Sequence, residues 1–231
     1  MFLQSFYTES DNQFSVSGEQ GSQFAKQICN DYNPIHDPDS KRFCVPGDLL
    51  FALSLNNYGL SEKMNFDFSG LVPADKLLVF PTSDSSELVI KDEREKAYLT
   101  LVREGDNNSD PKAIEHLVRS YVAFSGHSFP YILVPLMEQH QVMINNNRPL
   151  VMYQSMSLNL DQLELEKPEV KLINADMQVE GKRGNVTLHF AINDGGKAVG
   201  RGEKKLVLSG LREFDAQVMD QLIKEYEARK V

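Results

Sequence analysis

The stretch from Pro46 to Gly59, PGDLLFALSLNNYG, decides the fold expected of this chain. Pro46 suits the first turn of a helix, and the charge of Asp48 there complements the positive end of the helix dipole. The residues from Leu49 to Leu55 are apolar on almost every side of such a helix, and Gly59 is a typical stop. A helix that is apolar all round is buried. We therefore predict a central helix covered by a β-sheet.

Downstream of this helix the hydrophobic pattern changes to the period of two that is typical of β-strands. Turn residues separate the apolar runs at Pro73–Asp75 and at Asp84–Ser86. The predicted strands are Asn65–Leu71, Lys76–Thr82, Glu87–Lys91 and Ala97–Val102. The polar stretch Gly105–Pro111 follows them and is the predicted linker between the two halves of the chain.

The second half repeats this order of elements without repeating the residues. Its most apolar segment, within His127–Gln141, is the predicted second central helix, although Pro135 would kink it. The predicted strands after it are Leu150–Leu158, Val170–Val179, Gly184–Asn193 and Lys197–Leu208. An amphipathic helix is predicted after these strands, within Arg212–Lys230. We therefore expect an α+β fold in which two antiparallel sheets each wrap a central helix.

Composition excludes several classes of function. The chain has 231 residues, 41% of them apolar, and a net charge of −9, which does not suit a nucleic-acid binder. No run approaches the roughly 18 apolar residues that cross a bilayer, and the start lacks the pattern of a signal peptide. The two cysteines, Cys29 and Cys44, form no CxxC motif, which argues against structural zinc and for a reducing compartment. We expect a cytoplasmic protein without nucleic-acid or membrane partners.

Upstream of the central helix, a short non-helical run carries an acidic side chain and an imidazole. An amphipathic stripe in Glu19–Asn30 predicts a short helix that ends at this run. The turn at Asn33-Pro34 can aim Asp31 and His36 at a common point, where both side chains hold one water molecule. At the start of the central helix, the backbone N–H of Gly47 is available to a developing oxyanion.

These residues resemble the signature of a known family. The run Asp31-Tyr32-Asn33-Pro34-Ile35-His36 is similar to the D-x-N-P-[LIV]-H motif of the MaoC-like, (R)-specific enoyl-CoA hydratases, which have the hot-dog fold. Phe24-Ala25 and Gly47–Leu50 look like the flanking helices of that family, of which this chain would be a divergent member. The resemblance implies that Asp31 and His36 activate the water that adds to a 2-enoyl thioester. It also implies that Asn33 holds the loop and that the Gly47 N–H binds the thioester carbonyl.

The resemblance also bears on domains and ligands. Members of that family often pair two hot-dog units, either as a dimer or within one chain with one half degenerate. A double hot-dog is therefore expected here, with the hydratase-like motif in residues 1–113 and a degenerate unit in residues 114–231; a homodimer is a further expectation. Coenzyme A or acyl carrier protein would be part of the substrate, without a separate cofactor or metal. Lys41 and Arg42 are candidates to meet the phosphates of coenzyme A, unless they are simply a solvated pair of charges.

Two departures from the family pattern precede the central helix. The segment between His36 and this helix, Asp37–Pro46, is shorter than is usual in the family. Where family members often have His-Gly before the helix, this chain has Pro46-Gly47. Proline has no N–H, so one donor is missing at this point. These departures favour an alternative function, a non-catalytic protein that binds acyl thioesters or lipids, and a thioesterase has less support. The structural alternative for Asp31 is a carboxylate that only caps a turn.

Overall fold

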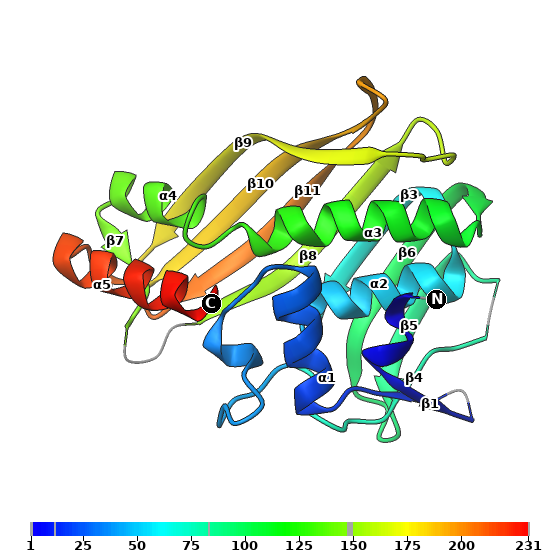
Figure 1. Cartoon of the computed structure of the whole chain (residues 1–231), viewed down its shortest axis with the longest axis horizontal. Coiled ribbons are helices and arrows are strands. Elements are labelled where there is room, and N and C mark those ends of the chain that lie inside the picture. Colours follow the sequence, from blue (N-terminus) through cyan, green and yellow to red (C-terminus); the bar gives the residue numbers. More distant parts are fainter. Residues whose placement is uncertain (1, 12, 83, 147–149, 231) are drawn as a thin grey trace.

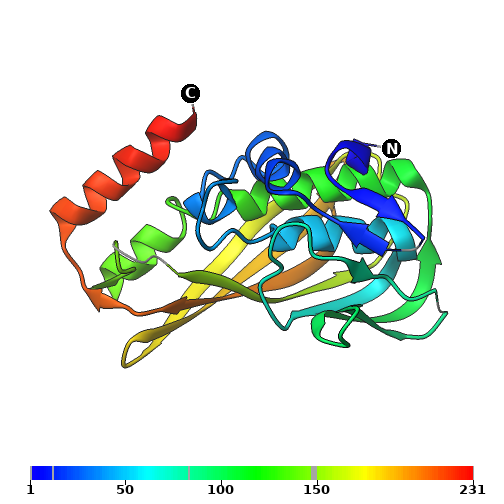
Figure 2. The same cartoon turned by 90° about the horizontal axis from the view of Figure 1, so that it is seen from below.

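The computed structural model describes residues 2–11, 13–82, 84–146 and 150–230 of the chain. In this part of the chain ten strands form one antiparallel sheet, and the helices lie on one side of it (Figures 1 and 2). The strands are β1 (Thr8–Ser10), β2 (Gln13–Ser15), β3 (Leu60–Phe68), β4 (Leu78–Val79), β5 (Glu87–Asp92), β6 (Ala97–Asn108), β8 (Val151–Leu160), β9 (Pro168–Glu180), β10 (Arg183–Asp194) and β11 (Lys197–Ser209). Their order across the sheet is β1-β2-β4-β5-β6-β3-β8-β11-β10-β9.

The predicted central helix is confirmed as α2 (Gly47–Tyr58). Its residues from Leu49 to Leu55 are all buried, as expected for a helix that is apolar on every side. The helix ends at Gly59, whose φ of 77° lies in the left-handed region that favours glycine. The short helix predicted upstream is also present, as α1 (Gly18–Gln23) and a π-helical turn over Phe24–Ile28.

The second central helix lies in a different place from the one predicted. It is α3 (Pro111–Gly126), and of the predicted segment His127–Gln141 only α4 (Leu133–Gln139) is α-helical. The predicted linker Gly105–Pro111 is wrong as well, because it completes β6 and supplies Asp110, the N-cap of α3. The physical reason is that α3 is amphipathic: it buries only one face on the core, so it needs fewer apolar residues than a helix that is buried all round. The buried residues of α3 recur at helical spacing: Ala113, Ile114, Leu117, Val118, Tyr121, Val122, Ser125 and Gly126.

The strands of the two halves meet in the middle of the sheet. There β3 pairs with β8, from Lys63 opposite Asn159 to Asp67 opposite Ser155. The α+β double hot-dog arrangement, with one helix against antiparallel strands in each half, is confirmed, but the two expected sheets are continuous because of this pairing. The division into residues 1–113 and 114–231 stays a prediction, and its boundary would fall in the first turn of α3.

Aromatic side chains join the two central helices in one core. The ring of Tyr121 on α3 lies 4.8 Å from that of Phe51 on α2 and 5.6 Å from that of Phe190 on β10. All three side chains are fully buried, and T-shaped or tilted pairs at these distances are favourable. This core fixes the end of α3 beside the start of α2, where the candidate site lies.

The two ends of the chain add smaller elements to this sheet. The N-terminal segment comprises a 3₁₀ turn, Phe2–Ser5, and the strands β1 and β2. The C-terminal helix is confirmed as α5 (Ala216–Glu227), and it follows β12 (Arg212–Glu213), which pairs with β7 (Val142–Met143). Of the helices described, none has the length and apolar character needed to cross a bilayer.

Candidate functional site

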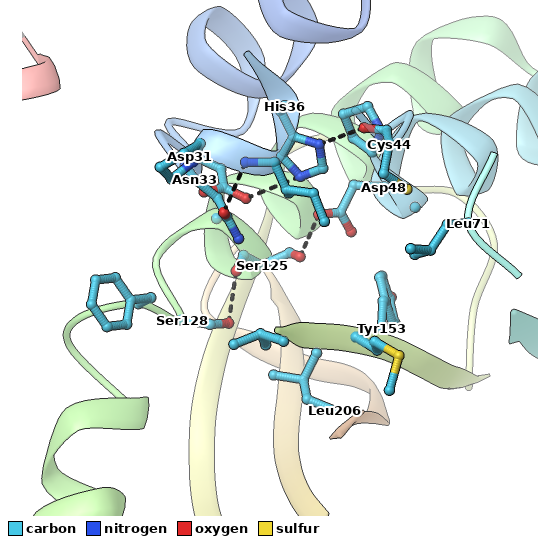
Figure 3. Close-up of a pocket in the computed structure, with 18 of the residues that line it drawn as sticks. Asp31, Asn33, His36, Cys44, Asp48, Leu71, Ser125, Ser128, Tyr153 and Leu206 are labelled. Carbon is cyan, nitrogen blue, oxygen red and sulfur yellow. Dashed lines mark hydrogen bonds and ion pairs between the residues drawn. The ribbon is translucent and has the colours of Figure 1, made fainter. Parts of the chain in front are cut away.

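A cavity of about 210 Å³ is lined by the Asp31–His36 loop, by α2, α3, β8 and β11, and by α5 (Figure 3). Its polar side holds Asp31, Asn33 and His36 together, as the sequence predicted. Its apolar wall includes Leu71, Val72, Phe129, Leu133, Ile144 and Leu206. The space is therefore polar at one side and suited to an alkyl chain at the other.

Local hydrogen bonds hold the loop in its turn. The backbone N–H of Asn33 donates to Asp31 Oδ1 at 2.9 Å, and Asn33 Oδ1 accepts from the N–H of Ile35 at 3.1 Å. Asn33 thereby caps a 3₁₀ turn, Pro34–His36. The N–H of Asp31 donates to the carbonyl of Ala25 at 2.8 Å and so ties the loop to the preceding helical turn. Asp31 also takes part in the turn, as its structural alternative supposed, but only through Oδ1.

The other oxygen of Asp31 faces the ring of His36. Asp31 Oδ2 lies 3.7 Å from His36 Nε2, which is too long for a direct hydrogen bond between them. His36 Nδ1 lies 2.7 Å from the carbonyl oxygen of Cys44, and because a carbonyl only accepts, Nδ1 carries the proton. In the neutral ring Nε2 is then an acceptor. Two acceptors therefore lie side by side, and one water molecule in the cavity next to them could donate a proton to each.

Gly47 begins α2 and lines the same cavity. The carbonyl of Pro46 accepts the N–H groups of Leu49 and Leu50, and Gly47 precedes both of these donors in the first turn. The first N–H groups of a helix have no partner within the helix, so they are available to a ligand. A Cβ at Gly47 would lie 2.9 Å from Cδ1 of Tyr153, so only glycine fits here without displacing that ring.

Lys41 and Arg42 lie in an exposed turn, and neither is among the residues that line the cavity. Their predicted contact with the phosphates of coenzyme A therefore stays a prediction. Arg229, which sequence reasoning did not single out, is the arginine that does line the cavity.

Sequence reasoning also missed a buried polar cluster in the cavity wall, formed by Asp48, Ser125 and Lys204. Asp48 was interpreted only as a helix-dipole residue. The alternation of side chains along β11 is a signal that could have found Lys204. Lys204, Leu206 and Leu208 are two residues apart and point to the same, buried face of the sheet, where a lysine is unexpected.

Tyr226 on α5 is a further residue that the sequence did not assign to the site. Its hydroxyl accepts the N–H of Tyr32 at 3.2 Å and makes a long hydrogen bond of 3.5 Å to Asp31 Oδ1. Burial raises the pKa of the Tyr226 hydroxyl, and the charge of Asp31 raises it further. The neutral phenol therefore braces the oxygen of Asp31 that faces away from His36.

Asp37 connects this loop to the upstream helical turn and to the 3₁₀ turn Ala228–Lys230 after α5 through two ion pairs. Its carboxylate accepts from Lys26 Nζ at 2.8 Å and from Arg229 at 2.7 Å. Partial burial alone would raise the pKa of Asp37, but the two cations outweigh it and hold the pKa below its usual value. A lowered folded-state pKa means that the pairs stabilise the fold above the unfolded pKa of about 3.9 and lose this effect as pH falls through the folded pKa.

We therefore expect Asp37→Asn to lower the free energy of unfolding by about 1 kcal/mol at neutral pH, since ion pairs near the surface contribute little each. The difference from the unsubstituted protein should shrink as the pH of urea titrations is lowered from about 5 toward 3. Asp39→Asn, at an exposed position of the same loop, is the matched control and should change little at any pH. A difference for Asp37→Asn that stays constant with pH would contradict the assignment.

Metal ligands are not grouped in the described part of the chain, where no cluster of three or more His, Cys, Asp or Glu side chains is placed to hold an ion. Both cysteines are buried free thiols. Burial raises the pKa of the Cys44 thiol to about 11, so it is a poor nucleophile at neutral pH.

Fold and site together define an α+β hot-dog protein with an acid–imidazole pair in a largely apolar cavity. The sequence model described as "Protein of unknown function (DUF3581)" matches residues 1–217, and the chain belongs to this family. A search of curated proteins by sequence gives no match.

Several solved structures are similar in outline at low sequence identity. A conserved protein of unknown function with a hot-dog fold from Alicyclobacillus acidocaldarius is 7% identical, with a TM-score of 0.48 over 90% of this chain and 98% of that one. An acyl-CoA thioesterase II from Mycobacterium marinum is 10% identical, with a TM-score of 0.41 over 94% and 99%. A MaoC-like dehydratase is 9% identical, with a TM-score of 0.42 over 87% and 97%.

Proposed function

We propose that this protein adds water to 2-enoyl thioesters, or removes it from (R)-3-hydroxyacyl thioesters, with Asp31 and His36 managing the water. The observation that carries the proposal is the pair of acceptors, Asp31 Oδ2 and His36 Nε2, that face each other at 3.7 Å in the cavity. A group that only capped a turn would not need its second oxygen aimed at an imidazole whose tautomer is set by the Cys44 carbonyl.

The chemistry follows from this geometry. A water held by both acceptors is oriented with an oxygen lone pair directed away from them, toward C3 of the enoyl group. As the oxygen bonds to C3, one water proton passes to the pair, and the electrons of the double bond move toward the thioester oxygen. The acid–imidazole pair then returns a proton to C2, so that H and OH have been added across the double bond. Dehydration is the reverse path.

Charge on the thioester oxygen must be stabilised during this reaction. In the proposal, the N–H of Gly47 at the start of α2 donates to this oxygen, where the helix dipole also favours negative charge. The acyl tail would lie along the apolar wall that includes Leu133, Ile144 and Leu206. The substrate carrier, coenzyme A or acyl carrier protein, would extend out of the cavity.

Incubation of the purified protein with crotonyl-CoA tests this function directly. We expect the absorbance of the conjugated enoyl thioester to fall as the 3-hydroxybutyryl product forms, with no release of free thiol. Release of thiol would instead identify a thioesterase. An unchanged absorbance, in the presence of protein that binds the thioester, would contradict the hydratase proposal for short chains.

One observation favours a second candidate, a non-catalytic protein that binds acyl thioesters. Pro46 is the N-cap of α2 and has no N–H, so the start of this helix offers one donor fewer to an oxyanion. This candidate predicts that acyl-CoA raises the melting temperature while crotonyl-CoA remains unchanged over long incubation.

A further inference from the structure

A second polar cluster lies in the same cavity, beside the Asp31–His36 pair. Asp48 belongs to the first turn of α2, Ser125 to the last turn of α3, and Lys204 to β11. All three line the cavity, although their exposed fractions are only 8%, 3% and 4%. Figure 3 shows Asp48 and Ser125 between His36 on one side and the side chains of the apolar wall on the other. Buried charges of this kind persist only where they have partners.

The hydrogen bonds in this cluster have a defined direction. Lys204 Nζ donates to Ser125 Oγ, because an ammonium group cannot accept. Ser125 Oγ then donates its proton to Asp48 Oδ2, and these two oxygens lie 2.5 Å apart. Lys204 Nζ also lies 4.3 Å from the centre of the Tyr153 ring. The Ser125 hydroxyl therefore bridges a buried cation and a buried carboxylate, because both Lys204 Nζ and Asp48 Oδ2 make hydrogen bonds with Ser125 Oγ.

One oxygen of the cluster remains without a donor. Asp48 Oδ1 is buried and has no hydrogen-bond partner among the residues that the structure describes. An unsatisfied carboxylate oxygen at such a depth is costly and uncommon. Burial raises the pKa of the Asp48 carboxyl, and the nearby Lys204 and Ser125 only partly oppose this effect. Because Asp48 lines the cavity, the missing donor can come from a bound ligand.

The charges around this position select the kind of ligand group. A carboxylate would be repelled by Asp48, and an ammonium group would be repelled by Lys204. A plain alkyl chain would leave Asp48 Oδ1 unsatisfied. A hydroxyl fits both neighbours, because it donates to the carboxylate and accepts from the ammonium group. If Asp48 is protonated, a hydroxyl can accept from it as well.

We propose that Asp48, Ser125 and Lys204 form a subsite for a hydroxyl group on the acyl chain, separate from the oxygen that Asp31 and His36 handle. The substrate class is then a thioester whose acyl chain carries a hydroxyl group away from C2 and C3. This inference rests on the proposed function in one respect, namely that the cavity holds the acyl group of a thioester.

Binding measurements with matched ligands test the subsite without catalysis. The ligands are butyryl-CoA against 4-hydroxybutyryl-CoA, and hexanoyl-CoA against 6-hydroxyhexanoyl-CoA, which have neither a conjugated double bond nor a 3-hydroxyl group. By calorimetry, we expect the hydroxylated member of at least one pair to bind on the order of 10- to 100-fold more tightly, as for a hydrogen bond to a charged group. In Asp48→Asn and in Lys204→Met this ratio should fall, because the first substitution removes the charged acceptor and the second removes the charged donor.

Ser54→Ala is the matched control. Ser54 is a buried serine of α2 whose hydroxyl donates to the carbonyl of Leu50, and it does not line the cavity. This variant should keep the preference for the hydroxylated ligand. If Asp48→Asn or Lys204→Met does not fold, the ligand comparison in the unsubstituted protein still decides.

Equal affinity within both pairs, or a preference that neither substitution at the cluster lowers, overturns the subsite. If crotonyl-CoA is nevertheless hydrated, the proposed function stands and only the subsite is wrong. If no member of either pair binds and crotonyl-CoA is unchanged, both proposals are wrong.

Discussion

Asp31→Asn should lower kcat/KM for the hydration of crotonyl-CoA by about 10²- to 10⁴-fold, the contribution of a positioned acid–base group. Asparagine keeps the shape of the side chain and an oxygen that can accept the N–H of Asn33, so the turn should persist. The amide has no negative charge, and an NH₂ group in the place of Oδ2 replaces one of the two acceptors by a donor. The water would then lose its place between two acceptors, and the pair would lose a group that can carry a proton.

The control for this experiment is Asp39→Asn, which removes one negative charge from an exposed position in the same loop. It should leave kcat/KM within a factor of about two, because exposed charges act weakly across solvent. Melting temperatures of both variants show whether the loop has kept its structure. Equal rates for the unsubstituted protein and Asp31→Asn would exclude the proposed role of this carboxylate.

Gly126→Ala should have the largest effect on stability. Gly126 ends α3, and a Cβ there would lie 1.9 Å from the carbonyl oxygen of Cys29 and 2.8 Å from its carbonyl carbon. Both atoms are backbone, so neither can move aside as a flexible side chain could. We expect the free energy of unfolding to fall by about 3 kcal/mol, the upper end of the usual cost of overpacking. Urea titrations followed by circular dichroism measure this change.

The same substitution should also damage the site. The backbone nitrogen of Asp31 would lie only 3.3 Å from the added Cβ. A movement of Cys29 that relieves its clash with this Cβ would therefore also shift Asp31, the first residue of the Asp31–His36 loop. Gly70→Ala is the matched control, because Gly70 also lines the cavity and its Cβ would meet nothing closer than 3.7 Å. That control should change stability by less than about 0.5 kcal/mol. An unaffected Gly126→Ala would show that α3 does not pack on this loop as closely as described.

The elements that the sequence predicts well are those whose signal is local. The helix over Leu49–Leu55 is apolar on every face, which leaves burial as its only stable setting. The strands after it alternate with a period of two, and observed strands lie in each of the predicted regions. Strand bounds differ by a few residues, most clearly for β6, which continues to Asn108 beyond its predicted end at Val102.

The second central helix shows where local signals mislead. The segment His127–Gln141 is more apolar than Pro111–Gly126, but only the second has a continuous stripe at helical spacing. Tertiary packing decides between them, because α3 buries that stripe on α2, β9 and β10 and leaves its polar face to solvent. Average hydrophobicity was therefore a poorer guide than periodicity.

The sequence by itself determined the α+β class, the central helix and the pairing of Asp31 with His36, because these depend on residues only a few positions apart. Within the six residues Asp31–His36, the turn at Asn33-Pro34 brings both side chains together. Only the tertiary structure brought Ser125 to Asp48 and Lys204 to Ser125, across 77 and 79 residues. It alone left Asp48 Oδ1 in the cavity wall without a hydrogen-bond partner among the described residues. Contacts of this range depend on how helices pack on a sheet, which no local pattern of residues encodes.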